Sequence, residues 1–262
     1  VHQFTRWRKN SFLCRRQMSE KTMEEQLDLL AIAAHPDDAE LGCGGILAKH
    51  AALGYRVGIL DLTEGQLGTR GSVAERRQEA AQASKILGLS ARHNLGFEDG
   101  RFLVDEAHRN AVMTQIRRFR PKVLLINAPS DRHPDHGRGA QLALEAWFYA
   151  GLRKLETSWN WEVQKPWRPD HVYHYIQYYD LTPSFSVDIT GYEGVKMEAI
   201  RAYSSQFYDP TRQEPETVLS SAAFLDQVRA RTSVWGQQIG VEHAEALVAP
   251  RTLGVSHLMQ LL

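Results

Sequence analysis

The sequence predicts an α/β protein: a three-layer, Rossmann-like, mostly parallel sheet with helices on both faces. Short continuous apolar runs, typical of buried strands, alternate with segments in which apolar residues recur at helical spacing. This alternation continues to about residue 150, an order typical of a parallel sheet covered by helices. Right-handed crossovers place the strand-to-helix loops along one edge of such a sheet. We therefore expect the active site at the C-terminal edge of the strands.

Glycine and proline separate the predicted elements. Gly54 and Gly88 each follow a helical pattern, and Pro121 ends another. In chain order we predict a strand at 27–34, a helix at 42–52, a strand at 56–63, a helix at 73–87, a short strand from 93, a helix at 107–119, a strand at 122–129, a helix after the loop 128–139, strands at 170–179 and 185–190, and helices at 191–203 and 222–237.

The chain length and the absence of a clear linker favour one folded domain, residues 23–262 of the 262-residue sequence. Residues 1–22 contain six Lys or Arg and one Glu, a net charge of +5, and no apolar segment of the secretory type. We interpret them as a basic, disordered N-terminal extension. A transit peptide or a phosphate-binding arm is the alternative.

Composition excludes several classes of partner. Lys plus Arg number 31, as do Asp plus Glu, so global charge does not favour nucleic acid. No apolar run approaches the roughly 18 to 20 residues that span a bilayer, so we expect no membrane partner. Two cysteines, Cys14 and Cys43, make neither a disulfide framework nor a thiolate zinc site, and we expect a cytoplasmic protein.

The stretch "HPDD", His35 to Asp38, directly follows the first predicted strand. A strand-to-helix turn lets an imidazole and a carboxylate converge on one ion, and Asp37 between them can accept a proton. Alternatively, Asp37 or Asp38 caps the next helix.

A second stretch, "HPDH", His133 to His136, also follows a predicted buried strand and precedes a helix. Both stretches are expected at the same edge of the sheet. Together they supply three or more nitrogen and oxygen ligands and no thiolate, which is the donor set of a catalytic zinc site. The pair therefore favours a metal site over a helix cap.

The glycine-rich turn "GCGG" allows a nucleotide-binding oxidoreductase as an alternative. However, Gly42, Gly44 and Gly45 do not make the spacing G-x-G-x-x-G, and the neighbouring carboxylates would repel a pyrophosphate.

The motifs "AHPDDAELGCGG" and "RHPDHG" resemble the LmbE-like / PIG-L family of zinc-dependent N-acetylglucosamine deacetylases. Further similarities are "DLTEGQLGTRG", "ERRQEA", "FYAGLRKL", "AYSSQFYDP" and "GVEHAEAL". They look most like the bacillithiol-biosynthesis branch. The resemblance implies removal of the N-acetyl group from N-acetylglucosaminyl-malate, with another N-acyl amino-sugar conjugate as the alternative. It also implies a homo-oligomer.

The resemblance implies roles for four residues of the two motifs. His35, Asp38 and His136 match the ligands of one Zn²⁺ per chain, and Fe²⁺ could share the same ligands. Asp37 matches the general base that takes a proton from the attacking water.

Further roles follow from the same resemblance. His133 matches the imidazole that stabilises the oxyanion or protonates the leaving amine, and Asp135 is expected to orient His133. Arg76 matches a substrate-binding arginine suited to a carboxylate, with a solvated helix arginine as the alternative. Arg70 is a second candidate, and Glu64 is expected to hold sugar hydroxyls.

Two positions depart from the family pattern. Phe224 lies where some relatives have a tyrosine, so Tyr203, Tyr208, or the metal with His133 would do its work. His243 also replaces a tyrosine of many relatives, and we interpret it as a structural histidine.

Overall fold

A computed structural model describes residues 26–261, which form a sheet of seven strands with helices on both faces and a separate two-stranded hairpin. The strand order in the main sheet is β3-β2-β1-β4-β7-β9-β8. The predicted basic extension, residues 1–22, lies outside the described residues.

The helices and strands follow the predicted order closely through the first half of the chain. In sequence they are β1 (Leu29–Ala33), α2 (Asp38–Ala52), β2 (Val57–Thr63), α3 (Val73–Ile86), β3 (Ala91–Phe97), α4 (Glu106–Phe119), β4 (Val123–Ile126), α5 (Pro134–Ala150), β5 (Ser158–Trp159), β6 (Glu162–Val163), β7 (His171–Tyr175), β8 (Phe185–Asp188), α6 (Glu193–Arg201), α7 (Ala222–Ile239), β9 (Ala244–Val248) and a final 3-10 turn, η1 (Leu258–Leu261).

The strand pairing confirms a mostly parallel sheet. Strand β1 pairs in parallel with β2 on one side and with β4 on the other, and β4 pairs in parallel with β7. The chain therefore winds outward in both directions from the β1–β4 pair. Such a switch point opens a crevice at the carboxyl ends of the two strands. The loops after β1 and β4 lead into this crevice.

The structure contains strands that were not predicted from the sequence, the β5–β6 hairpin and β9, and one helix that starts earlier than expected. Strand β9 inserts antiparallel between β7 and β8. Helix α2 begins at Asp38 rather than at Gly42, because its first turn directly follows the bend after β1.

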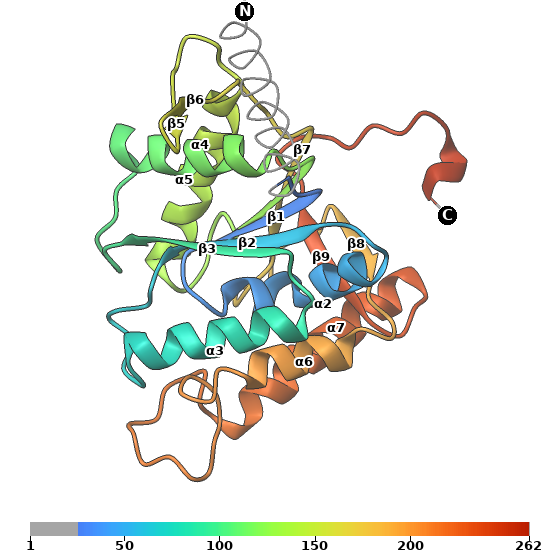
Figure 1. The fold of residues 1–262 in the computed structure, drawn as a ribbon. Coiled ribbons are helices and arrows are strands. Elements are labelled where there is room, and N and C mark those ends of the chain that lie inside the picture. The colour runs from blue at the N-terminus through green and yellow to red at the C-terminus, as the bar shows by residue number, and fades with distance from the viewer. Residues whose placement is uncertain (1–25, 262) are drawn as a thin grey trace, which may run out of the picture.

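The core forms one layer on each face of the sheet. Alternate residues of β1 point to opposite sides: Leu29, Ala31 and Ala33 belong to one cluster, and Leu30 and Ile32 to the other. In Figure 1, helices α4 and α5 cover one face of the sheet, and α2, α3, α6 and α7 cover the other. Every residue of β1 is buried.

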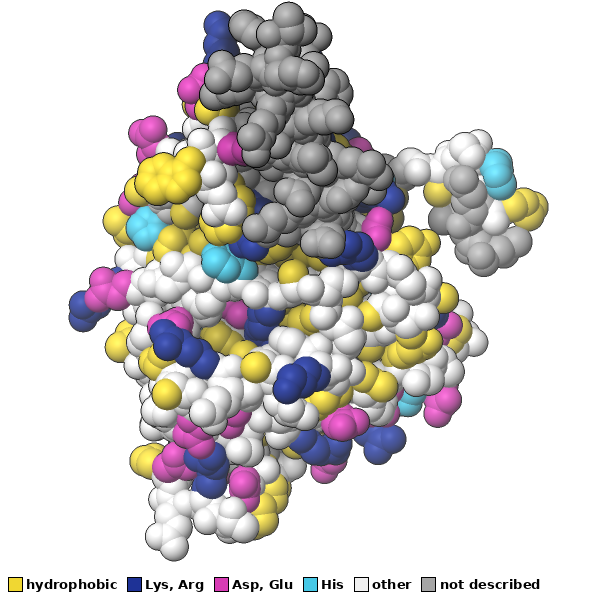
Figure 2. Space-filling view, in the orientation of Figure 1, with side chains coloured by type: hydrophobic (Ala, Val, Ile, Leu, Met, Phe, Trp, Pro, Cys, Tyr) yellow, Lys and Arg dark blue, Asp and Glu magenta, His cyan; other side chains and the backbone are white. Residues whose placement is uncertain are grey.

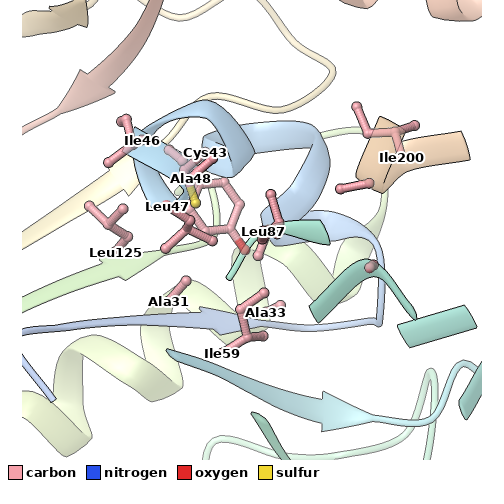
Figure 3. Packing of buried hydrophobic residues seen from close by; sticks show 14 of the residues in the cluster. Ala31, Ala33, Cys43, Ile46, Leu47, Ala48, Ile59, Leu87, Leu125 and Ile200 are labelled. Carbon is pink, nitrogen blue, oxygen red and sulfur yellow. The ribbon is translucent and has the colours of Figure 1, made fainter. Parts of the chain in front are cut away.

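Helix α2 packs directly on the centre of the sheet. Figure 3 shows Cys43 and Leu47 of this helix facing Ala31 and Ala33 of β1. Cys43 is fully buried among these residues, as expected for a small apolar side chain. Its backbone leaves the helical region, with φ −147° and ψ 20°, so α2 consists of two helical segments joined by a kink.

A buried ion pair stabilises the second segment of α2. The Glu245 carboxylate, from β9, accepts hydrogen bonds from the backbone N–H groups of Gly45 (3.0 Å) and Ile46 (2.7 Å). These amides begin the second segment and have no carbonyl partner within it. Lys196 Nζ lies 2.5 Å from the same carboxylate and also donates to the Leu41 carbonyl. The pair therefore connects α6 and β9 to the kink.

Among the described residues, no helix is both long enough and apolar enough to cross a membrane. On the described part of the face in Figure 2, basic and acidic side chains are interspersed.

Gly42 allows α2 to approach the sheet, and its replacement provides a test of this packing. A methyl group at position 42 would lie 2.2 Å from Cδ2 of the fully buried Tyr175. We expect Gly42→Ala to lower the free energy of unfolding by about 1–3 kcal/mol, because the ring must move in a packed core. Denaturant unfolding measures this value.

The matched control is Gly194→Ala in helix α6, where an added methyl group meets no atom within 4 Å. There we expect stability to stay the same or to rise by up to about 1 kcal/mol. Equal stability of the two variants would contradict the close approach at Gly42.

Candidate metal centre

The loops after β1 and β4 bring the two histidine motifs together. The His35 ring lies 4.7 Å from the His133 ring and 5.7 Å from the His136 ring, measured between centroids. His136 Nε2 lies 3.0 Å from Asp38 Oδ1, and His35 Nδ1 lies 3.6 Å from Asp38 Oδ2. The residues that the resemblance names as metal ligands therefore converge on one point.

The carboxylate of Asp38 is held by polar groups from three segments of the chain. It accepts hydrogen bonds from the backbone N–H of His35 (2.9 Å), from Asn127 Nδ2 (3.1 Å) and from Gln177 Nε2 (2.9 Å). Asn127 follows β4 and Gln177 follows β7. Sequence reasoning missed both amides, because neither lies in a motif.

Carboxylates also contact the far side of the two imidazoles. His136 Nδ1 lies 2.5 Å from Asp131 Oδ2, and His35 Nε2 lies 3.1 Å from Asp99 Oδ1. Such contacts fix the orientation of a ligating imidazole and increase its basicity. Neither Asp131 nor Asp99 was predicted from the sequence. Asp131 could have been found from its place two residues before His133, whereas nothing local indicates Asp99.

The arrangement suits a divalent cation. Ligand atoms of His35, His133 and His136 lie within 4.8 Å of one another, and so do those of His35, Asp99 and Asp135. Two imidazoles and one carboxylate form the three-ligand set of many catalytic zinc sites, which keep a further position open. The donor set at this point therefore fits a metal ion.

The titration behaviour of the site also favours a positive charge. Burial disfavours a charged His35, but hydrogen bonds with Asp135, Asp38 and Asp99 outweigh it and hold the pKa of His35 well above its usual value. Burial likewise opposes a charged His136, yet Asp38 and Asp131 raise the pKa of His136 to about 9. A proton, or a metal ion in its place, balances the surrounding carboxylates.

Asp37 occupies an unusual backbone conformation at the start of α2. Its φ of 112° lies in a region that residues other than glycine seldom adopt. The side chain is buried, and burial raises the pKa of Asp37 to about 7 although the neighbouring Arg76 acts to lower it. Asp37 makes no side-chain cap hydrogen bond to α2, so the helix-cap alternative does not describe it.

Asp135 contacts a different histidine from the one expected. Its Oδ2 lies 3.4 Å from His35 Nε2 and accepts a hydrogen bond from the Gly100 backbone N–H. Among the described side chains, no hydrogen bond joins the Asp135 carboxylate to the His133 ring. Instead, His133 Nδ1 accepts from the Asp135 backbone N–H at 3.3 Å. We expected the Asp135 carboxylate to orient His133, but in the structure the Asp135 backbone N–H contacts His133 instead. Asp135 lies in the first turn of α5, and its carboxylate faces His35.

A cavity of about 550 Å³ opens beside the cluster. His35, Asp37, Asp38, His133 and His136 line one part of it. Apolar side chains from several elements also line it, namely Leu41, Ile176, Val218, Leu219, Phe224 and Trp235. The cavity therefore combines the candidate metal ligands with apolar surface. Such concave, mixed surfaces are typical of small-molecule sites.

The structure separates the three residues expected to bind substrate. Arg76 lines the cavity, but its Nη2 donates to Asp37 Oδ2 at 2.8 Å and to Gln206 Oε1 at 2.9 Å. Arg70 is buried and is not among the lining residues. Glu64 accepts a hydrogen bond from Arg77 and lines a separate, smaller pocket. Substrate contacts by these residues stay predictions.

The family's tyrosine position is apolar here. Phe224 lies in the cavity wall and stacks on Phe207, with 6.0 Å between ring centroids. Tyr203 is fully buried and donates to Glu40, and neither it nor the exposed Tyr208 lines the cavity. Tyr178, which sequence reasoning did not single out, does line it.

His243 behaves as a structural histidine. It is buried outside the cavity lining, and its Nδ1 lies 3.0 Å from the Thr232 hydroxyl of α7.

Comparisons with known proteins identify the family. The PIG-L family model, described as GlcNAc-PI de-N-acetylase, matches residues 30–147. Diacetylchitobiose deacetylase of Thermococcus kodakarensis is 30% identical over 229 residues, which cover 84% of this chain and 81% of the relative. A 1D-myo-inositol 2-acetamido-2-deoxy-alpha-D-glucopyranoside deacetylase of Streptomyces scabiei is 29% identical over 180 residues, 55% of this chain and 54% of the relative. The crystal structure of the conserved protein TT1542 from Thermus thermophilus matches with a TM-score of 0.79 and 38% identity, covering 89% of this chain and 99% of that one.

The chain belongs to the PIG-L family. The expectations of an α/β fold and of a deacetylase are confirmed. A nucleotide-binding oxidoreductase, which the glycine-rich turn left open, has no support from these matches.

The contact between Asp131 and His136 can be tested through its effect on metal affinity. We expect Asp131→Asn to weaken binding of a divalent metal by about 10- to 100-fold, because the charged partner of the imidazole is lost. Competition with a chelator measures this affinity.

Asp105→Asn is the matched control, since Asp105 Oδ1 makes the same kind of contact with His108 Nδ1, at 2.8 Å, away from the site. It should leave metal affinity unchanged. An Asp131 variant that holds metal as tightly as the unmodified protein would show that this carboxylate does not support a ligand.

Proposed function

We propose that this protein is a Zn²⁺-dependent hydrolase that removes the acetyl group from an N-acetylglucosamine conjugate. The observation that carries the proposal is the convergence of His35, Asp38 and His136 on one point, with Asp37 and His133 lining the same cavity. The family relatives add the substrate class, since the relative from Thermococcus kodakarensis is a diacetylchitobiose deacetylase.

The proposed ligands are His35, Asp38 and His136. A Zn²⁺ ion held there would polarise the acetyl carbonyl and lower the pKa of a water molecule to about 7. Fe²⁺ is the alternative ion, because nitrogen and oxygen donors also suit iron.

Asp37 is the proposed general base. Asp37 lies next to the proposed ligand Asp38 in the sequence. Its Oδ2 pairs with Arg76 Nη2 at 2.8 Å and not with a histidine. It accepts the proton of the attacking water and thereby helps the oxygen to add to the acetyl carbon. The raised pKa of Asp37, about 7, suits this exchange near neutral pH.

His133 is the proposed partner of the developing oxyanion and of the leaving amine. Burial and, after it, the neighbouring His35 and His136 lower the pKa of His133. Its Nδ1 faces the Asp135 backbone N–H, which leaves Nε2 for the substrate. When the C–N bond breaks, the amine takes up a proton and leaves as the free amino sugar, and the acyl group leaves as acetate.

The proposed substrate in particular is N-acetylglucosaminyl-malate, on the resemblance of "FYAGLRKL" and "AYSSQFYDP" to the bacillithiol branch. One relative is a diacetylchitobiose deacetylase and another a 1D-myo-inositol 2-acetamido-2-deoxy-alpha-D-glucopyranoside deacetylase, so another N-acyl amino-sugar conjugate is the alternative. The cavity of about 550 Å³ has room for a group beyond the amino sugar.

Two substitutions separate metal binding from proton transfer. We expect His136→Ala to lose both bound metal and acetate release, because a ligand is removed. We expect Asp37→Asn to keep the metal while acetate release falls by about 10²- to 10⁴-fold, because the base is removed. Metal analysis and an acetate assay on the same preparations measure both effects.

Gln227→Ala is a suitable control, since Gln227 lines the cavity but contacts none of the proposed ligands in the described structure. Full metal content and full activity in the His136 variant would show that the ligand assignment is wrong. Unchanged activity of the Asp37 variant would exclude it as the base.

A further inference from the structure

Apolar surface of the cavity begins next to the proposed base and one proposed ligand. Leu41 lies three residues after Asp38 in α2, and its backbone N–H donates to the Asp37 carbonyl at 2.9 Å. Residues three apart on a helix share a face. Leu41, Asp37 and Asp38 all line the cavity. A leucine side chain is therefore placed within one helical turn of the two carboxylates.

Three further residues extend this apolar surface. Phe224 and Val228 lie one turn apart on α7, and Leu219 precedes that helix. Phe224 belongs to the hydrophobic cluster on this face of the sheet, and Leu41, Leu219 and Val228 pack against the same cluster. All four residues also line the cavity. We call them the apolar wall, because the connected core of the protein reaches the cavity surface at these positions.

The apolar wall is suited to a hydrocarbon group. The side chains of leucine, phenylalanine and valine carry no hydrogen-bond donor or acceptor. Phe224 is only 8% exposed, and its ring stacks on Phe207 with 6.0 Å between centroids, so the ring is held by packing. Contact with a hydrocarbon chain removes apolar area from water on both partners and is therefore favourable.

The acyl group is the part of an N-acyl amino sugar that this wall would meet. Hydrolysis takes place at the carbonyl carbon, so the substituent on that carbon lies beside the proposed base and ligands. The aglycone is separated from the same carbon by the sugar ring. An acetyl group presents one methyl group to the wall, which covers only a small part of four side chains.

We propose that the apolar wall binds the acyl chain of the substrate and that the enzyme hydrolyses amino sugars with acyl chains longer than acetyl, such as hexanoyl. This inference rests on the proposed function and extends its substrate class. Water adds to the carbonyl carbon, the C–N bond breaks, and the nitrogen takes up a proton. The products are the free amino sugar and the carboxylate of the acyl chain.

The first experiment compares binding of the N-acetyl and N-hexanoyl forms of one conjugate, glucosaminyl-malate. Calorimetry with the Asp37→Asn protein measures both affinities without turnover. The hexanoyl chain has four additional methylene groups, and burying them should increase affinity by about 10- to 100-fold over the acetyl form. Equal affinity for the two forms, or weaker binding of the hexanoyl form, would overturn the proposal.

Two substitutions at Val228 locate the chain. Val228→Phe places a ring in the space of the chain, and the ratio of hexanoyl to acetyl affinity should fall by about tenfold. Val228→Thr keeps the shape of the side chain and adds a hydroxyl group, so the ratio should fall by about two- to fivefold. The second variant tests the wall even if the larger side chain disturbs folding.

The matched controls are Val234→Phe and Val234→Thr. Val234 lies on the same helix, is 53% exposed and is not among the lining residues, so the affinity ratio should stay unchanged. An unchanged ratio in both Val228 variants would show that the chain binds elsewhere and would overturn the proposal.

Turnover separates this inference from the proposed function. The unmodified enzyme should release hexanoate as well as acetate. Release of acetate alone, with tight binding of the hexanoyl form, would show that the wall does not face the reacting carbonyl and would overturn the inference. Release of neither acid, with a Val228-dependent preference for the hexanoyl form, would support the apolar wall and refute only the assignment as a hydrolase.

Discussion

The carboxylate of Asp38 is the group around which the site is arranged. It accepts hydrogen bonds from the His35 backbone, Asn127 and Gln177, and it lies 3.0 Å from His136 Nε2. These partners come from the ends of β1, β4 and β7 and from the start of α5. Burial acts against the charged form, but His136 and His35 keep the pKa of Asp38 well below its usual value. The Asp38 carboxylate therefore connects the residues that follow β1, β4 and β7. Its negative charge favours a cation at the carboxyl ends of these strands.

The kink in α2 lets the helix place Asp38 in the crevice and also pack its apolar residues on the sheet. The first turn of the helix carries Asp38 over the crevice, while the second segment packs on β1. A straight helix would couple these two positions rigidly. Breaking the helix at Cys43 frees backbone N–H groups, and Glu245 with its partner Lys196 stabilises them. A buried pair of this kind is costly to disrupt from one side, since the remaining charge has no partner. The unpredicted strand β9 thus supports the helix that carries Asp38 into the candidate metal centre.

Ion pairs beneath the site hold Asp37 in its unusual backbone conformation. Arg76 joins Asp37 to Gln206, and Arg92 joins Glu40, in the first turn of α2, to Asp61 of β2. A strained backbone conformation persists only where surrounding contacts hold it in place, and these ion pairs and hydrogen bonds do so at Asp37. Arg76 is therefore engaged at the proposed general base through Asp37.

The sequence by itself determined the order of strands and helices through α5 and the two motifs that supply the proposed ligands, because apolar periodicity reports burial locally and both motifs lie at strand ends. It did not determine which carboxylate meets which imidazole. Asp131 lies in the loop after β4 and Asp135 lies in the first turn of α5, and in the structure Asp135 contacts His35 whereas Asp131 contacts His136. Strand β9 was also missed, since its five residues include the buried Glu245, whose partners lie far away in sequence. Partner choice depends on distances between remote segments, and only the closed tertiary structure sets those distances.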